Sequence, residues 1–238
     1  MSTVTLSFDE THHIIDGKAL YSNRFDKIQN FHSPPDYAPV ELNHTAFFIN
    51  LKGEKVFNRT FNHAFGFYDG IATVSDDLGF FHINQAGQDI HSFRFEWSGN
   101  FQENYCVVKD IVTQNFFHID RQANSIYPEQ YAYVGDYKYG IAVIVNELGL
   151  STHINNKGHF IHNQFFLELD VYHKGYAIAK DKLGYFHIDK QGIALYSAHY
   201  QKLEPFYNDR AVAVAHDNTK LIISPIGDII QIINQKPF

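Results

Sequence analysis

One phrase, of the form G-[FY]-F-H-I-[DN], stands twice in the chain, at Gly79 and again at Gly184. Aligning the chain on the histidine of this phrase gives a period of about 35 residues. The histidine position recurs at His82, His118, His153 and His187. The same step reaches His12 and Phe48 before them and Ile222 after them. Seven units therefore fill the chain, and this period is typical of architectures whose units stack on one another.

Further columns repeat in step with the histidines. Two aromatic residues six positions apart recur as Phe25/Phe31, Phe61/Phe67, Phe95/Phe101, Tyr131/Tyr137, Phe166/Tyr172 and Tyr200/Phe206. A residue that tolerates positive φ follows at Asp36, Gly70, Asn104, Gly140, Gly175 and Asp209. Two positions later comes a small residue, at Ala38, Ala72, Cys106, Ala142, Ala177 and Ala211. This order predicts a left-handed turn that leads into a strand with a small residue at its start.

Each unit translates into short strands. The small residue begins one strand, and the histidine lies in a second strand with alternating pattern. A turn of the form [ND]-x-x-G, as at Asn84 and Asp189, leads to a third strand such as IALY. The segment from Ser2 to Val4 stands where the first unit needs its opening strand. No window shows a sustained helical period, so the sequence predicts an all-β protein.

Units of about 35 residues with three or four short strands cannot bury both faces alone and must stack. A closed β-propeller and an open β-solenoid both achieve this. The small-residue strand favours the propeller, because blades crowd at the axis, and closure removes sheet edges. We therefore expect one repeat domain over residues 1–238, a propeller of seven short blades, with a six-bladed ring or a solenoid as alternatives. The units begin near residues 2, 38, 72, 106, 142, 177 and 211, and the last is incomplete.

Composition limits the classes of function. Hydrophobic residues make up 45% of the chain, which is ample for a core. The net charge of −7 comes with no run of basic residues, which argues against nucleic acid as a partner. The single cysteine, Cys106, excludes an internal disulfide and a cysteine-based zinc site. No segment approaches the roughly 18 apolar residues of a membrane-spanning helix, so we expect a cytoplasmic protein without membrane contact. We also expect a monomer.

Two segments carry a family resemblance. FYDGIATVSDDLGFFHINQAG, from Phe67, and YHKGYAIAKDKLGYFHIDKQG, from Tyr172, resemble WG repeats, whose unit has an F-x-x-G-L-A-x-V strand and a G-Y-I-D-x-x-G hairpin. Two departures stand out: a histidine is inserted into the hairpin strand, and Leu78-Gly79 and Leu183-Gly184 replace the Trp-Gly pair. The resemblance covers nearly the whole chain. It implies a β-repeat module that binds a partner, and similar histidine-containing units accompany methyltransferase-type domains in some bacterial proteins.

The histidine column is the most conspicuous candidate for chemistry. Equivalent positions of neighbouring blades lie far apart compared with metal–ligand bonds of about 2 Å, and Phe48 and Ile222 replace the histidine in two units. We therefore expect each histidine to hydrogen-bond an adjacent strand or blade, with no metal and no cofactor. Protonation of all 15 histidines would move the formal net charge from −7 to +8. That swing suggests a stability or partner choice that changes near pH 6.

An enzymatic function has little support in the sequence. Glu168/Asp170 and Asp76/Asp77 are the nearest pairs of carboxylates for a glycosidase-like hydrolase, yet both lie at expected turns. No nucleophile elbow, zinc-protease, P-loop or dinucleotide motif occurs. We therefore assign no catalytic residue.

A binding site is best sought where the repeat varies. Two residues after the first aromatic of each pair, every class of side chain occurs: Lys27, His63, Trp97, Tyr133, Glu168 and Lys202. Trp97 and Tyr133 are aromatic anchors of the kind that interfaces favour. A solvent-facing column free to drift would show the same variety. We expect a non-catalytic scaffold that recognises a protein or peptide through loops on one propeller face, with a glycan-binding lectin as the alternative and a hydrolase after it.

Overall fold

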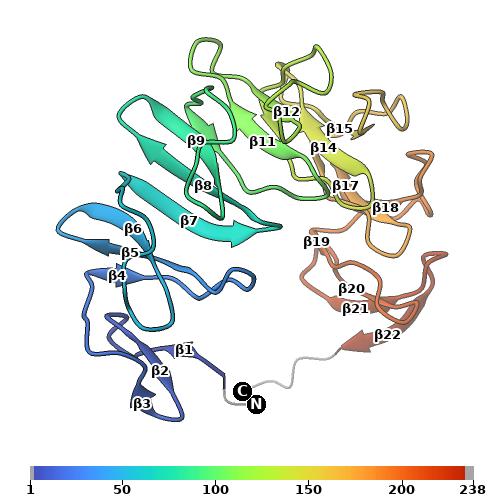
Figure 1. Ribbon diagram of the computed structural model, residues 1–238. Coiled ribbons are helices and arrows are strands. Elements are labelled where there is room, and N and C mark those ends of the chain that lie inside the picture. The colour runs from blue at the N-terminus through green and yellow to red at the C-terminus, as the bar shows by residue number, and fades with distance from the viewer. Residues whose placement is uncertain (1–2, 234–238) are drawn as a thin grey trace. The chain divides into compact units, whose positions relative to one another are not determined.

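The computed structural model describes residues 3–233, which form strands and turns with no helix, and so contain no helix able to span a membrane (Figure 1). The chain divides into two compact units, Met1–Ser125 and Ile126–Phe238. Within the described residues the strands form seven small antiparallel sheets, numbered 1 to 7 in chain order. The all-β expectation is confirmed.

The N-terminal unit holds sheets 1 to 4. Their strands are β1 (Thr5–Leu6), β2 (His13–Ile15) and β3 (Lys18–Ala19); β4 (Lys27–Ile28), β5 (Ala38–Leu42) and β6 (Thr45–Ile49); β7 (His63–Tyr68), β8 (Ile71–Asp76) and β9 (Gly79–Asn84); β10 (Trp97–Ser98), β11 (Cys106–Lys109) and β12 (Phe116–Ile119).

The C-terminal unit holds sheets 5 to 7. Their strands are β13 (Tyr133–Val134), β14 (Ile141–Val145) and β15 (Ser151–Asn155); β16 (Glu168–Leu169), β17 (Ala177–Asp181) and β18 (Gly184–Ile188); β19 (Lys202–Leu203), β20 (Ala211–Val214), β21 (Lys220–Ile223) and β22 (Ile229–Ile233).

The sheets begin at a different point of the repeat from the predicted units. From sheet 2 onward each sheet starts with a short strand from the aromatic-pair segment, which the sequence did not identify as a complete strand. The expected third strand is reduced to one isolated bridge in most sheets, for example Ile188 with Ala194. The chain bends directly after that bridge and crosses to the next sheet, so no ladder extends. In the described part of the chain, the expected third strand forms a ladder only as β3 in sheet 1 and as β22 in sheet 7.

The first unit departs from the predicted alignment. Ser2 lies outside the described residues, and the opening strand is Thr5–Leu6 rather than Ser2–Val4. Leu6 pairs with His13, as Thr73 pairs with His82 in sheet 3. His13, not His12, therefore occupies the histidine position. His13 lies 35 residues before Phe48, which fits the period as well as the 36-residue step to His12 does.

The turn and small-residue columns are confirmed. Each predicted turn residue has a positive φ, from 56° at Asp209 to 92° at Gly175. The small residue that follows is buried in every sheet from 2 to 7. Ala72 shares one core cluster with the rings of Phe48, Phe61, Phe67 and Phe81. A small side chain at this place leaves room for those rings, which join sheet 2 to sheet 3.

The glycine of the repeated phrase lies where one sheet meets the next. Phe80 and Phe95 exchange backbone hydrogen bonds of 2.8 and 2.9 Å, and this bridge ties sheet 3 to the segment that begins sheet 4. Gly79 has a φ of 133°, and a Cβ placed there would lie 2.4 Å from the Phe95 carbonyl oxygen. Gly184 repeats this arrangement against Tyr200. Close backbone approach explains why the phrase begins with glycine.

Candidate functional site

The histidine column joins successive sheets. In three sheets, Nε2 of the histidine lies within hydrogen-bond distance of a backbone carbonyl oxygen. The pairs are His13 with Gln29 at 2.9 Å, His153 with Asp170 at 2.9 Å, and His187 with Glu204 at 3.0 Å. Each accepting residue belongs to the segment that enters the next sheet. The second aromatic of that segment packs on the imidazole, with ring centroids 4.3 Å apart for His153 and Tyr172. The expected hydrogen bond to an adjacent strand or blade is confirmed for His153 and His187, and His13, which takes the place expected for His12, makes the same bond.

The geometry fixes the tautomer of these rings. A carbonyl oxygen only accepts, so Nε2 carries the proton and donates it. Nδ1 is then the acceptor. The hydroxyl of Tyr196 donates to Nδ1 of His187 over 2.5 Å, and that of Tyr21 to Nδ1 of His13 over 2.5 Å. In sheet 5, Nε2 of His162 supplies the proton to His153 over 3.0 Å.

Burial keeps these imidazoles neutral. Desolvation lowers the pKa of His82 to about 3 and the pKa values of His153 and His187 to about 4. Desolvation also lowers the pKa of His13. A neutral ring with both nitrogens in hydrogen bonds is a structural element rather than a general base at neutral pH.

The donor to Nδ1 forms a column of its own, which the sequence reasoning missed. The donors lie eight or nine positions after the histidine, at Tyr21, His91, His162 and Tyr196, and Phe57 occupies the same place in sheet 2. Where Phe48 replaces the histidine, Phe57 replaces the donor, and their rings pack 5.6 Å apart. In sheet 2 the two positions change together, from a hydrogen-bonded pair to an apolar pair. This joint change was the available signal.

The six predicted binding residues all begin the first strand of their sheets. Lys27, His63, Trp97, Tyr133, Glu168 and Lys202 open β4, β7, β10, β13, β16 and β19, and all are exposed. Each first strand pairs only on one side in its sheet. Trp97 is 42% exposed and Tyr133 51% exposed. The column is therefore a set of accessible side chains at equivalent places within each unit.

Several members of this column contact a neighbouring strand. Lys27 forms an ion pair with Glu41 over 3.1 Å, and Nδ1 of His63 lies 2.9 Å from the Ser75 hydroxyl. Glu168 is held by the Lys180 ammonium over 2.5 Å. These pairs match the strand register, so cross-strand pairing accounts for part of each side chain's placement.

The carboxylate pairs considered for hydrolysis are engaged in other contacts. Asp76 accepts from Arg94, with 2.9 Å between the charged atoms, and Asp77 accepts from the Asn62 amide over 2.9 Å. The hydrogen bond from Lys180 lowers the pKa of Glu168, and desolvation raises the pKa of Asp170. Within residues 3–233, no group of three or more His, Cys, Asp or Glu side chains is placed to hold a metal ion.

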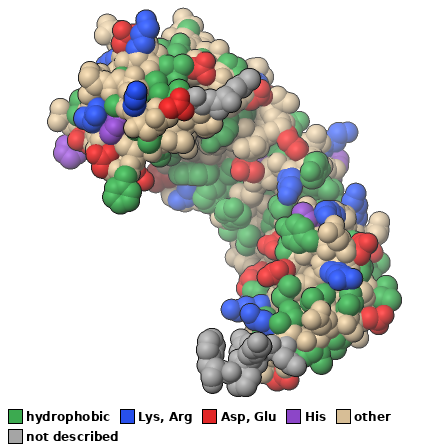
Figure 2. Space-filling view, turned by 90° about the horizontal axis from the view of Figure 1, so that it is seen from below, with side chains coloured by type: hydrophobic (Ala, Val, Ile, Leu, Met, Phe, Trp, Pro, Cys, Tyr) green, Lys and Arg blue, Asp and Glu red, His purple; other side chains and the backbone are tan. Residues whose placement is uncertain are grey.

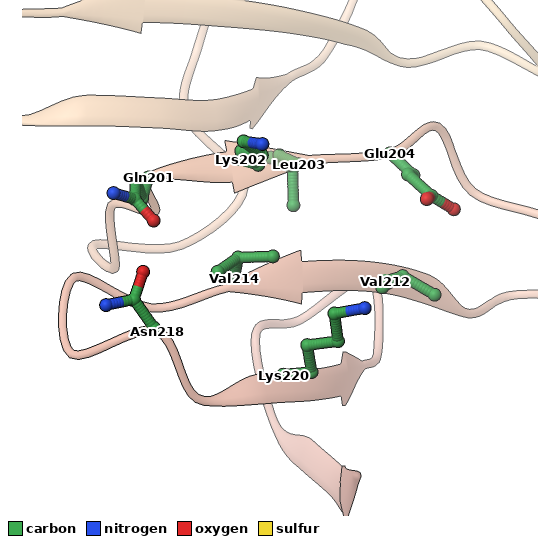
Figure 3. Close-up of a pocket in the computed structure, with 8 residues that line it drawn as sticks. All are labelled: Gln201, Lys202, Leu203, Glu204, Val212, Val214, Asn218 and Lys220. Carbon is green, nitrogen blue, oxygen red and sulfur yellow. The ribbon is translucent and has the colours of Figure 1, made fainter. Parts of the chain in front are cut away.

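Hollows lie beside three of the predicted residues. In sheet 7, Lys202 and Lys220 line a pocket of about 540 Å³ between β19, β20 and β21 (Figure 3). In the same unit Tyr133, Asp170 and Tyr207 line a second pocket of about 440 Å³. A smaller hollow of about 130 Å³ includes Lys27. On the face shown in Figure 2, charged side chains of both signs and apolar side chains are interspersed.

The family comparison agrees with the columns. The model of the "WG containing repeat" matches residues 47–77, from β6 through the aromatic pair Phe61/Phe67 into β8. Residues 47–77 are a WG repeat. The sequence resemblance to WG repeats is thus confirmed on this segment, which carries the Phe48 and Ala72 positions of the repeat. A comparison with curated proteins gives no match.

Solved structures show the fold. The chain is similar to BamB from Moraxella catarrhalis, a β-propeller, with 10% identity and a TM-score of 0.51 over 98% of this chain and 88% of that chain. It is also similar to a eukaryotic initiation factor, at 8% identity and a TM-score of 0.52, covering 97% and 72% of the two chains. Hsv2 of Kluyvelomyces marxianus matches at 12% identity and a TM-score of 0.47, over 88% and 77%. The similarity to BamB confirms the β-propeller fold class.

Proposed function

We propose that this WG-repeat protein is a non-catalytic binding module that holds a protein or peptide through the first strands and adjoining loops of its sheets. The observation that carries the proposal is the first-strand column. The repeat keeps its buried residues nearly constant, yet the exposed residue that opens each first strand is basic, acidic, imidazole or aromatic. Packing does not dictate such variety, and a rigid frame with variable exposed positions suits recognition.

Trp97 and Tyr133 are the proposed anchors in the two units. Each is about half exposed, so part of the ring is fixed by the sheet and part is available to a partner. Trp97 packs edge-on against Phe116, with centroids 6.2 Å apart, which limits the freedom that binding would remove. Half-fixed aromatic rings give much contact area for little loss of entropy. Lys27, His63, Glu168 and Lys202 would add polar contacts around them.

The test is affinity capture with the intact protein and two variants. Trp97→Ala/Tyr133→Ala removes both anchors. Phe160→Ala is the matched control, because Phe160 is a 46% exposed aromatic outside the first-strand column. A protein captured by the wild type and by the control, and lost from the double variant, supports the proposal.

Two other results would change it. A partner retained by a correctly folded double variant would move the binding site away from the first strands. A glycan array in which a multivalent glycan binds far better than its monosaccharide would replace the protein partner with a sugar, since exposed aromatic rings also stack on sugars.

A further inference from the structure

A lysine-rich pocket lies between loops of sheets 5 and 6 in the C-terminal unit. It has a volume of about 480 Å³ and is lined by Lys138, Lys174, Lys190, Tyr139, Tyr172 and His173, among others. Lys138 precedes β14, Lys174 precedes β17, and Lys190 follows β18. No Asp or Glu is among its lining residues. A protein with a net charge of −7 therefore has three lysines around one hollow, and a wall of one sign concentrates the field for an anion.

These lysines have no acidic partner in the described structure. Among residues 3–233 none of the three lies within ion-pair distance of a carboxylate. Asp189, next to Lys190, uses one carboxylate oxygen to accept the backbone N–H groups of Gln191 and Ile193. The Lys174 ammonium instead lies over the Tyr207 ring, 5.5 Å from its centroid.

In the N-terminal unit, the positions equivalent to Lys190 and Tyr139 hold a base and an acid that pair with each other. Arg121 stands three residues after His118, as Lys190 stands three residues after His187. Asp69 precedes Gly70 in the turn of the preceding sheet, as Tyr139 precedes Gly140. Arg121 forms an ion pair with Asp69. Replacement of the acid by Tyr139 leaves Lys190 without that neutralising partner, so sheets 5 and 6 differ here from sheets 3 and 4.

The pocket continues into a larger surface. Lys138 and His173 also line the neighbouring hollow of about 440 Å³, which contains Tyr133, Pro205 and Tyr207. The rings of His173 and Tyr207 pack 4.7 Å apart and connect the two hollows. An extended ligand could place an anionic group among the lysines and lay apolar side chains along Tyr207 and Tyr133. A single small anion would use only the first hollow.

We propose that the lysine pocket binds a phosphorylated side chain within a peptide segment of the partner. This inference rests on the proposed function, since it names the chemistry of the partner. A phosphoryl group carries nearly two charges and three strong acceptor oxygens, which matches several ammonium donors better than one carboxylate does. Acidic Asp170 in the adjoining hollow and the overall negative charge favour a peptide over an anionic membrane surface.

The experiment measures binding of a short synthetic peptide, with a central phosphoserine flanked by Leu and Pro, to the full chain by calorimetry. The unphosphorylated peptide, inorganic phosphate, and phosphatidylcholine vesicles with and without phosphatidic acid are parallel probes. Lys174→Gln/Lys190→Gln is the test variant, and Arg121→Gln, at the equivalent place in the N-terminal unit, is its control. We expect the phosphopeptide to bind the wild type, with a loss of about tenfold per lysine in the test variant and little change in the control.

Three results would overturn the inference. The first is equal binding of both peptides, and the second is equal affinity for inorganic phosphate and phosphopeptide, which would indicate a free-anion site. The third is binding of the phosphatidic acid vesicles alone. Failure of the phosphopeptide together with a captured partner that depends on Trp97 and Tyr133 would reject this pocket and leave the proposed function standing. Phosphopeptide binding without such a partner would reject the first-strand anchors and keep the pocket.

Discussion

The Tyr196 hydroxyl donates a hydrogen bond to Nδ1 of His187, and the opposite nitrogen of that ring donates to the Glu204 carbonyl. One imidazole thereby connects the end of its own sheet to the first strand of the next. Phe48 and Phe57 achieve the same connection between sheets by apolar packing alone. The repeat therefore accepts either a fully hydrogen-bonded pair or a fully apolar pair at this place, and a half-satisfied pair should be costly.

Removing only the donor of this pair should destabilise the protein. Tyr196→Phe leaves the buried Nδ1 of His187 without a partner, at a cost of about 1–3 kcal/mol in the free energy of unfolding. The double variant His187→Phe/Tyr196→Phe copies the Phe48/Phe57 pair and should recover much of that loss. Denaturant unfolding measures both, with Tyr68→Phe at an exposed site as the control. A double variant less stable than Tyr196→Phe would contradict the equivalence of the two pairs.

Acid should destabilise the protein through the histidine column. The folded pKa values of His82, His153 and His187, about 3, 4 and 4, lie below the usual 6.5 of an unfolded histidine. The unfolded chain therefore takes up protons first as the pH falls. The stabilisation is fully present above about pH 6.5 and is lost progressively toward pH 4, by about 1.4 kcal/mol per pH unit for each histidine.

The melting temperature between pH 7.5 and about 4.5 measures this effect. It should fall steadily below about pH 6.5, and the fall should be shallower in His187→Phe/Tyr196→Phe, which has one column histidine fewer. An unchanged melting temperature over that interval would mean that the buried histidines titrate alike in the folded and unfolded chain. The sequence suggested a pH response from the number of histidines, whereas the prediction now rests on the lowered pKa values of the buried rings.

Cys106 should resist modification in the folded protein. Its side chain is 0% exposed, and its sulfur lies 3.3 Å from the Ser98 hydroxyl in the interior of sheet 4. A thiol reagent should react only when this region opens, at a rate that rises with denaturant. The unfolded chain supplies the reference rate. Labelling of the native protein at that reference rate would show that sheet 4 opens freely.

Much of the fold could be predicted because its strongest constraints are local and repeated. A left-handed turn needs Gly, Asn or Asp, and a crowded strand start needs a small residue. The roles of Gly140 and Ala142 could therefore be predicted from the sequence. The histidine of the first unit was misassigned because His12 and His13 are adjacent, and steps of 36 and 35 residues back from Phe48 both fit the period. The length of the third strand was overestimated because Tyr196 fits the pattern of an ordinary strand residue, whereas its hydroxyl donates a hydrogen bond to His187.

The binding surfaces depend on contacts between segments that no column marks. The sequence singled out Tyr133 because its position varies from unit to unit of the repeat, and in the structure Tyr133 lines a hollow. It did not identify the lysine pocket, because Lys138, Lys174 and Lys190 come from three connections at three different places in the repeat. Only the fold brings them together.

Two glycines with similar backbones separate conformational strain from close packing. Gly158 and Gly140 have φ values of 76° and 72°. A Cβ at Gly158 would lie 2.7 Å from the Tyr127 side chain, whereas one at Gly140 would meet nothing within 4 Å. Gly140→Ala should cost about 1–2 kcal/mol in the free energy of unfolding, from the left-handed conformation alone. Gly158→Ala adds an overpacking cost of about 1–3 kcal/mol. Denaturant unfolding of both variants checks this order, and equal losses would show that the Tyr127 ring moves aside without cost.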